Sequence, residues 1–192
     1  METTEPDIMI ETFSSFIKQT SEESDRGSVL VAVSIIDDIL AQLLKVKLVP
    51  TLERNDELFD GAYAPFSSFS ARIDLAYRVA LIGTNTRRSC HILRKIRNDF
   101  AHATEVKGFT HSATQDRIRE LFKLNSNMVE LLEKVIIEGT KGHEIEIREF
   151  NDLIKKFGWR FVFQLLFASL ASSLAVAIDE IQGIKPLSLP PL

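Results

Sequence analysis

Hydrophobic positions recur at helical spacing along most of the chain. In the segment 26–49 they return every three or four residues and so share one helix face, at Val29, Val33, Ile36, Leu40, Leu43 and Leu44. The same period marks 7–20, 66–83 and 112–138, and no hairpin dipeptide such as Asn-Gly joins alternating segments. This pattern predicts an all-α fold.

Proline and glycine indicate where the predicted helices end. The helix 26–49 should stop before Pro50, because a residue that precedes proline avoids the helical region. The acidic segment 51–65 then forms a loop, which could also act as a mobile lid. Gly83 has the typical position of a residue that terminates a helix, here 66–83. Further helices are predicted to begin at Thr84 and to cover 112–138, 144–157 and 159–182.

The length of the chain, 192 residues, suits one globular domain with one core. We therefore predict a single helical domain over residues 1–184, built as a bundle of about six to seven helices. Residues 185–192, which contain three prolines, should form an extended tail.

The segment 161–178 is apolar, has no formal charge and approaches the minimum length of a membrane span. It nevertheless contains Gln164 and several serines, and its helical pattern continues into Asp179 rather than into a basic stop. We predict that it is buried as a central helix, or packs against a second subunit, and does not enter a membrane.

Charge and cysteine content exclude several kinds of site. A formal net charge of −4 argues against a broad surface that neutralises many phosphates, so any contact with nucleic acid must be local. The lone Cys90 permits neither an internal disulfide nor a cysteine-based zinc site. The acidic, polar residues 1–7 do not resemble a signal peptide, so we expect a cytoplasmic location.

The segment 92–103, ILRKIRNDFAHA, predicts a helix with an apolar and a basic face. On a helical wheel centred on Ile96, the apolar stripe contains Ile92, Leu93 and Phe100. The opposite face is polar, and Arg97 lies at the border of the stripe. That face holds Arg87, His91, Arg94, Lys95, Asn98 and His102, and of these Arg87, His91, Arg94 and Lys95, together with the neighbouring Arg88, are candidates for RNA binding.

Arg97 and His102 are candidate catalytic residues for RNA cleavage without a metal or other cofactor. An imidazole can exchange protons with a ribose 2′-hydroxyl and a leaving 5′-oxygen, while a guanidinium holds the phosphate. Asn98 could orient the imidazole or the phosphate, and Asp99 could set the histidine tautomer or pair with a neighbouring arginine. In the alternative interpretation, this is an ordinary solvated helix face.

The spacing of the two candidates creates a geometric problem. Residues five apart lie about 140° from each other around a helix and cannot readily meet. Either the helix loosens after Phe100, or a second copy approaches across a twofold axis so that Arg97 of one chain serves His102 of the other.

Three stretches within 64–121 resemble the mannitol operon repressor family of bacterial proteins: APFSSFSARIDLAYRVALIG, HILRKIRNDFAHA and GFTHSATQDRIREL. This resemblance implies a regulator of transcription. Only the turn at Gly83 could belong to a helix-turn-helix, and the preceding helix adds just Arg72 and Arg78 for phosphate contacts. A regulator of this kind would therefore act non-enzymatically through a partner protein.

The shorter stretch RNDFAH is similar to the Arg-polar-x3-His motif of HEPN domains. That resemblance implies a small helical bundle that cuts RNA without metal, as toxins and anti-phage effectors do, and that acts as a dimer. It gives the catalytic roles to Arg97 and His102, and the polar position to Asn98. We predict a HEPN-like endoribonuclease that forms a homodimer, with the regulator as the alternative.

Overall fold

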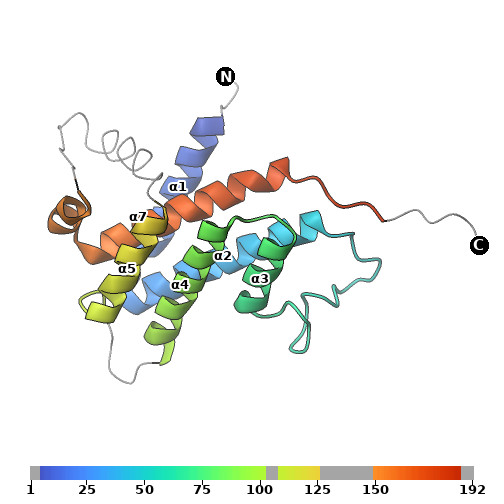
Figure 1. Cartoon of the computed structure of the whole chain (residues 1–192), viewed down its shortest axis with the longest axis horizontal. Helices are drawn as coiled ribbons and strands as arrows, with labels where there is room; N and C mark the ends of the chain where they lie inside the picture. Colours follow the sequence, from blue (N-terminus) through green and yellow to red (C-terminus); the bar gives the residue numbers. More distant parts are fainter. Residues whose placement is uncertain (1–4, 103–107, 126–148, 187–192) are drawn as a thin grey trace, which may run out of the picture.

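The computed structural model of the protein describes residues 5–102, 108–125 and 149–186. Within these ranges it contains six helices and no strand, which confirms the all-α prediction. The helices are α1 (Glu5–Ser21), α2 (Asp25–Lys47), α3 (Phe69–Arg78), α4 (Thr84–His102), α5 (Ser112–Leu124) and α7 (Phe150–Glu180), shown in Figure 1.

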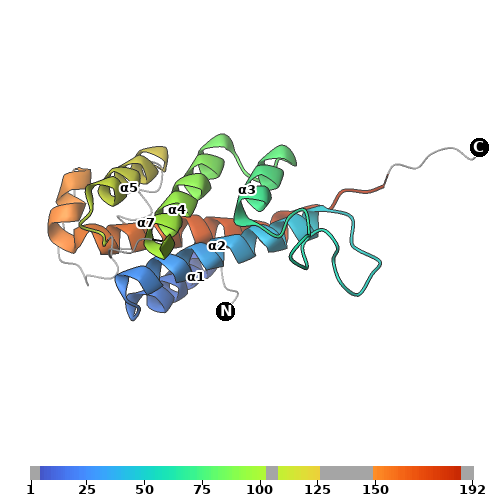
Figure 2. The same cartoon turned by 90° about the horizontal axis from the view of Figure 1, so that it is seen from below.

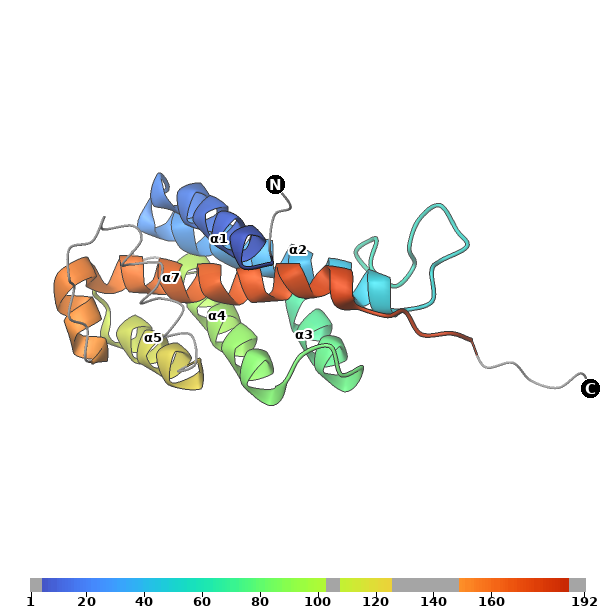
Figure 3. The ribbon, with the colours of Figure 1, turned by 90° about the horizontal axis from the view of Figure 1, so that it is seen from above.

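The helices form two layers. The long helices α2 and α7 run side by side, and α1 packs along both of them (Figures 1 and 3). On the other side, α5, α4 and α3 lie in a row across this pair, with α4 in the middle (Figure 2). Helix α4 thus contacts α2, α3 and α5, and its remaining side faces outward.

Helix α7 is the central helix of the bundle. It is the one helix of the described ranges that is long and apolar enough to cross a membrane, yet 67% of its most apolar window is buried inside the protein. Every residue from Val162 to Ser172 is buried, because α1, α2 and α5 all pack against this stretch. This agrees with the prediction of a buried central helix for 161–178 and is the pattern expected of a soluble core helix.

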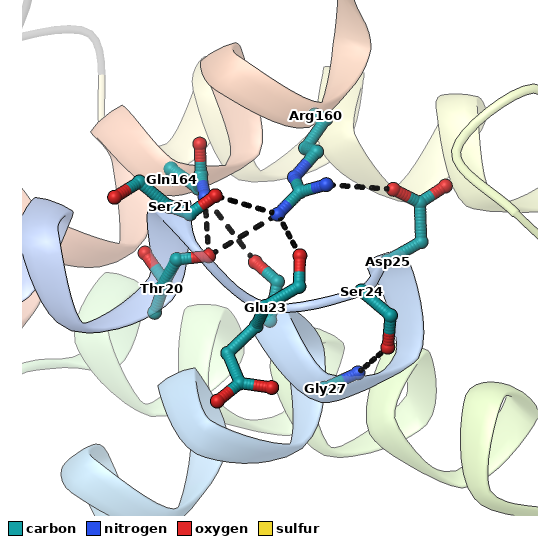
Figure 4. Close-up of polar contacts among 9 residues, drawn as sticks. Thr20, Ser21, Glu23, Ser24, Asp25, Gly27, Arg160 and Gln164 are labelled. Atoms are coloured by element: carbon teal, nitrogen blue, oxygen red, sulfur yellow. Dashed lines mark hydrogen bonds and ion pairs between the residues drawn. The ribbon is translucent and has the colours of Figure 1, made fainter.

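Polar side chains of α7 hold the turn between α1 and α2 in place (Figure 4). Arg160 donates hydrogen bonds to the carbonyl oxygens of Thr20, Ser21 and Glu23, and its Nη1 lies 3.3 Å from Asp25 Oδ1. The buried Gln164 donates to Thr20 O at 2.9 Å. The last carbonyls of α1, which have no partner within their own helix, are thereby satisfied. Ser24 Oγ caps α2 by accepting from the Gly27 amide.

Helix α3 ends earlier than the sequence indicated, and the prediction that Gly83 terminates it was wrong. The last helical residue is Arg78, and the left-handed position is occupied by Ala80, with φ of 58°. The Leu81 amide donates to Ala76 O at 2.9 Å and the Ala80 amide to Tyr77 O at 3.1 Å, which is the Schellman pattern. Gly83 instead precedes α4, where its carbonyl accepts from the Arg87 amide.

Replacing Ala80 with glycine is therefore expected to raise the free energy of unfolding by about 0.5–1 kcal/mol. The left-handed conformation costs a residue with a Cβ about 1–2 kcal/mol, and the greater freedom of glycine in the unfolded chain offsets part of the gain. Urea unfolding of the two proteins measures the difference. Gly83→Ala is the control: a Cβ there meets no atom within 4 Å and φ is not positive, so stability should change by less than about 0.5 kcal/mol. A destabilised Ala80→Gly protein would contradict this description of the turn.

Two other predicted boundaries can be compared with the structure. Gly158, with φ of 77° and ψ of 165°, interrupts α7 at the predicted break between 144–157 and 159–182. Only glycine adopts this conformation readily. The predicted helix 112–138 ends earlier, at Leu124, where Asn125 is the C-cap and its amide donates to Phe122 O at 3.1 Å, so the prediction of one continuous helix was wrong. The start predicted at 144 and most of the tail 185–192 lie outside the described residues.

The predicted loop 51–65 is irregular in the structure, and it is anchored to the bundle. Phe59 is buried, lies 5.8 Å from the Phe66 ring and is covered by the ammonium group of Lys45. Lys45 Nζ also lies 3.6 Å from Asp60 Oδ1. These contacts connect the loop to the end of α2.

Candidate functional site

Helix α4 carries all nine candidate site residues and remains α-helical from Thr84 to His102. Its apolar stripe is buried as predicted, with Ile92, Leu93, Ile96 and Phe100 in the core. No loosening follows Phe100 within the helix. Near its end, Arg26 of α2 donates to Ala101 O at 2.7 Å, which satisfies one of the final carbonyls. Of the two geometries considered for Arg97 and His102, a loosened helix is not observed up to His102.

Arg97 and His102 are both exposed, and they lie on different sides of this regular helix. Arg97 Nη1 donates to Asn98 Oδ1 at 3.2 Å and forms no ion pair within the described residues. His102, in the last turn of α4, has no hydrogen-bond partner there either. Asn98 thus orients the guanidinium rather than the imidazole. Within one chain the structure does not bring the two candidate catalytic groups together.

Arg87 and His91, the two candidates nearest to α3, both contact the carboxylate of Asp74 on that helix. Arg87 donates from Nε and Nη2 to Asp74 Oδ1, at 2.9 and 2.7 Å, and His91 Nε2 lies 3.3 Å from the same oxygen. The hydrogen bonds from Arg87 lower the pKa of Asp74 below its usual value, and His91 adds to this effect. Burial raises the pKa, but by less. Arg87 also stacks over the Tyr77 ring. Arg87 and His91 therefore connect α4 to α3, and the charge of Arg87 is partly neutralised by Asp74.

On the side of α4 that faces α5, two residues form ion pairs with that helix. Asp99 accepts a hydrogen bond from Arg117, and both side chains are about three-quarters buried. Of the two roles considered for Asp99, pairing with an arginine is the one observed. Arg88 lies 4.0 Å from Glu120 Oε1 at a more exposed position. Lys95 is exposed on the outer face between these two borders.

Arg94 and Arg97 line a cavity of about 560 Å³ between α2, α3 and α4. Buried Nε of Arg94 has no hydrogen-bond partner, and its guanidinium forms no ion pair with the described residues. The rest of the cavity wall is formed by apolar and polar side chains of α2, by residues at and just before the start of α3, and by Asn98. The wall residues other than the arginines are Leu30, Val33, Ser34, Asp37, Ser67, Ser68, Phe69, Ser70 and Asn98.

Asp37 is the acidic residue of this cavity, and Arg72 of α3 neutralises it. Arg72 Nη1 lies 2.8 Å from Asp37 Oδ1, and Arg72 Nε donates to Phe66 O. Burial raises the pKa of Asp37 above its usual value, although the hydrogen bond and charge of Arg72 act in the other direction. Arg72 itself does not line the cavity. The cavity therefore presents Arg94 and Arg97 as two guanidinium groups without a bound carboxylate.

Other chemistry is poorly represented in the described part of the chain. Cys90 is completely buried, and this burial raises the pKa of its thiol to about 12, which makes it a structural residue. No group of three or more His, Cys, Asp or Glu side chains within these ranges is arranged to hold a metal ion. His111 caps α5 through Nδ1, which accepts from the Ala113 amide.

Sequence reasoning missed the cavity and the residues that neutralise the basic face. Asp74 of α3 and Arg117 of α5 pair with residues of α4, and Asp37 of α2 lines the cavity beside Arg94 and Arg97, only after the bundle has folded. No local pattern in the sequence connects them. Comparison of this chain with known protein families, with characterised proteins and with solved structures finds no match.

Proposed function

We propose that this protein is a HEPN-like, metal-independent endoribonuclease that acts as a homodimer in the cytoplasm, as a toxin or an anti-phage effector. Arg97 of one chain and His102 of its partner form each active site. The observation that carries the proposal is the exposure of both groups on one unbroken helix, where neither is occupied by a carboxylate of the described residues. A second copy supplies the group that a single chain cannot.

The reaction is an attack of a ribose 2′-hydroxyl on the adjacent phosphorus. A base removes the 2′-hydroxyl proton, the new P–O2′ bond forms, and the P–O5′ bond breaks. The leaving 5′-oxygen receives a proton, and the products are a 2′,3′-cyclic phosphate and a 5′-hydroxyl. His102 serves as base or acid, and Arg97 stabilises the negative charge on the phosphate oxygens.

Asn98 supports this assignment of roles. Because its side-chain oxygen accepts from Arg97, the guanidinium is held at a fixed position on the surface of α4 while its other N–H groups stay available to a phosphate. The outer face around Lys95 adds positive charge. Arg87, Arg88 and His91 have carboxylate partners and contribute less to RNA binding than the sequence alone indicated.

The test is incubation of the purified protein with single-stranded RNA in the presence of EDTA. We expect fragments that end in a 2′,3′-cyclic phosphate. An oligonucleotide with one 2′-deoxyribose at the cleaved position should resist cleavage at that position alone, because it lacks the attacking hydroxyl. Intact RNA after incubation with the folded dimer would refute the proposal.

The second candidate function is a non-enzymatic regulator that binds a partner protein. It is favoured by the internal ion pairs of Arg87, Arg88 and Asp99, which show that part of the basic face holds α4 against its neighbours. For such a protein, changing His102 should leave function unaltered. Overexpression distinguishes the two functions. If the protein is a nuclease, the wild type slows cell growth and the His102→Ala variant does not. If it is a non-enzymatic regulator, cells grow equally with the wild type and the variant.

A further inference from the structure

The cavity between α2, α3 and α4 has the size and the wall chemistry of a ligand site. Its volume of about 560 Å³ is within the range of sites for small molecules, which is roughly 300–1,000 Å³. It exceeds what a bare phosphate ion would fill. One part of the wall is apolar, from Leu30, Val33 and Phe69, and another carries the two arginines.

The polar part of the wall is incompletely satisfied. Arg94 Nε is removed from solvent yet has no acceptor among the described residues, and a buried donor in this state costs roughly 1–3 kcal/mol. Arg97 donates one hydrogen bond to Asn98, and its other N–H groups remain available to a ligand. Two guanidinium groups in one cavity, without a carboxylate bound to either, favour a ligand that carries negative charge.

The start of α3 adds donors to the same wall. Ser68 Oγ accepts from the Ala71 amide and Ser68 O accepts from the Arg72 amide. The amides of Phe69 and Ser70 have no partner within the described ranges, as the first N–H groups of a helix generally do not. Backbone amides at a helix start bind phosphate oxygens well. Ser68, Phe69 and Ser70 line the same cavity as Arg94 and Arg97.

We infer that this cavity binds one nucleotide, with its phosphate between Arg94, Arg97 and the start of α3 and its base against Phe69. The inference rests on the proposed function in taking an RNA strand as the source of that nucleotide. Since Arg97 belongs to both sites, the bound nucleotide neighbours the one that is cut. The cavity thereby positions the strand for His102 of the partner chain.

The test measures binding of a short, fluorescently labelled, fully 2′-O-methylated RNA by anisotropy. This strand cannot undergo the proposed reaction, so binding is observed whether or not the protein cleaves RNA. Arg94→Gln is expected to weaken binding by about 10- to 100-fold, the effect of losing a hydrogen bond to a charged group. Arg119→Gln, on α5, is the control, because it removes the same charge outside both the cavity and the basic face of α4, and it should weaken binding by less than about threefold.

A third variant tests the charge of the cavity in the opposite direction. Asp37→Asn keeps an oxygen that can accept from Arg72 and removes the negative charge, so it should strengthen binding several-fold. Thermal unfolding establishes whether the Asp37→Asn protein is folded; if it is not, the comparison of Arg94→Gln with Arg119→Gln decides alone. Equal losses in those two variants, or no loss in either, would overturn the inference.

Competition identifies the source of the nucleotide. Uridine 5′-monophosphate should displace the labelled strand from the wild-type protein while uridine, which lacks the phosphate, should not. If uridine 5′-monophosphate displaces the labelled strand at about the concentration that unlabelled RNA requires, the cavity binds free nucleotides. If it requires a much higher concentration, the cavity binds a nucleotide of an RNA strand. If uridine competes as well as its monophosphate, the phosphate assignment is wrong. If the protein cleaves RNA but Arg94→Gln binds RNA as tightly as the wild type, the cavity is not a nucleotide site, and the nuclease proposal is unaffected.

Discussion

Replacing His102 with alanine is expected to lower the rate of RNA cleavage by about 10²- to 10⁴-fold, the usual contribution of a general acid or base. The imidazole is exposed in the last turn of α4 and has no hydrogen-bond partner among the described residues, so its loss should leave the fold intact. Cleavage of a labelled RNA under single-turnover conditions measures the chemical step, and circular dichroism with thermal unfolding measures the fold.

His111→Asn is the matched control for that experiment. His111 is also exposed and follows α4 in the chain, but it caps α5 by accepting from the Ala113 amide. Asparagine is a good cap residue and keeps such an acceptor, so the variant loses an imidazole without losing the cap. Its cleavage rate should remain within about twofold of the wild type. Equal activity of the His102→Ala and wild-type proteins would exclude His102 from the chemistry.

Phe167→Ala is expected to lower the free energy of unfolding by about 3–5 kcal/mol. Phe167 is fully buried in the middle of α7, and its ring lies 6.0 Å from that of Phe16 on α1. The substitution removes a fully buried ring that packs on α1, and it leaves a cavity that the closely packed core cannot fill. For a domain of this size the midpoint of thermal unfolding should fall by on the order of 10 °C.

The control on the same helix is Ser173→Ala, at an exposed position of the apolar segment. Its stability should stay within about 0.5 kcal/mol of the wild type. Both variants should be recovered in the aqueous fraction without detergent, because most of the apolar surface of α7 is buried inside the protein. A protein that needs detergent, and that tolerates Phe167→Ala as well as Ser173→Ala, would show that α7 packs against lipid instead.

Periodicity predicted the amphipathic helices well because each has an apolar stripe, whereas α7, buried on all sides from Val162 to Ser172, was predicted from its apolar length. The stripe of α4, with Ile92, Ile96 and Phe100, is buried as the helical wheel indicated. The break at Gly158 was also predictable, since glycine is needed for its backbone conformation. The end of α3 was not, because the left-handed position is occupied by Ala80 and not by a glycine, which the sequence does not reveal.

The candidate site was predicted only in part, for a physical reason. The spacing of Arg97 and His102 is a local property and can be read from the sequence. Which arginines are neutralised depends on Asp74 and Glu120, and the cavity of Arg94 depends on α2 and on the start of α3. These partners lie far along the chain or on other helices, and only the packing of the row α3, α4 and α5 across α2 brings them together.

The most direct test of the account mixes two inactive variants. Arg97→Ala and His102→Ala proteins are each expected to be nearly inactive, because every site in either dimer lacks one group. When the two are coexpressed in equal amounts, about half of the dimers contain one chain of each kind, and each such dimer has one complete site of two. Cleavage should then recover to about a quarter of the wild-type rate. A mixture that is no more active than either variant alone would contradict a site shared between two chains.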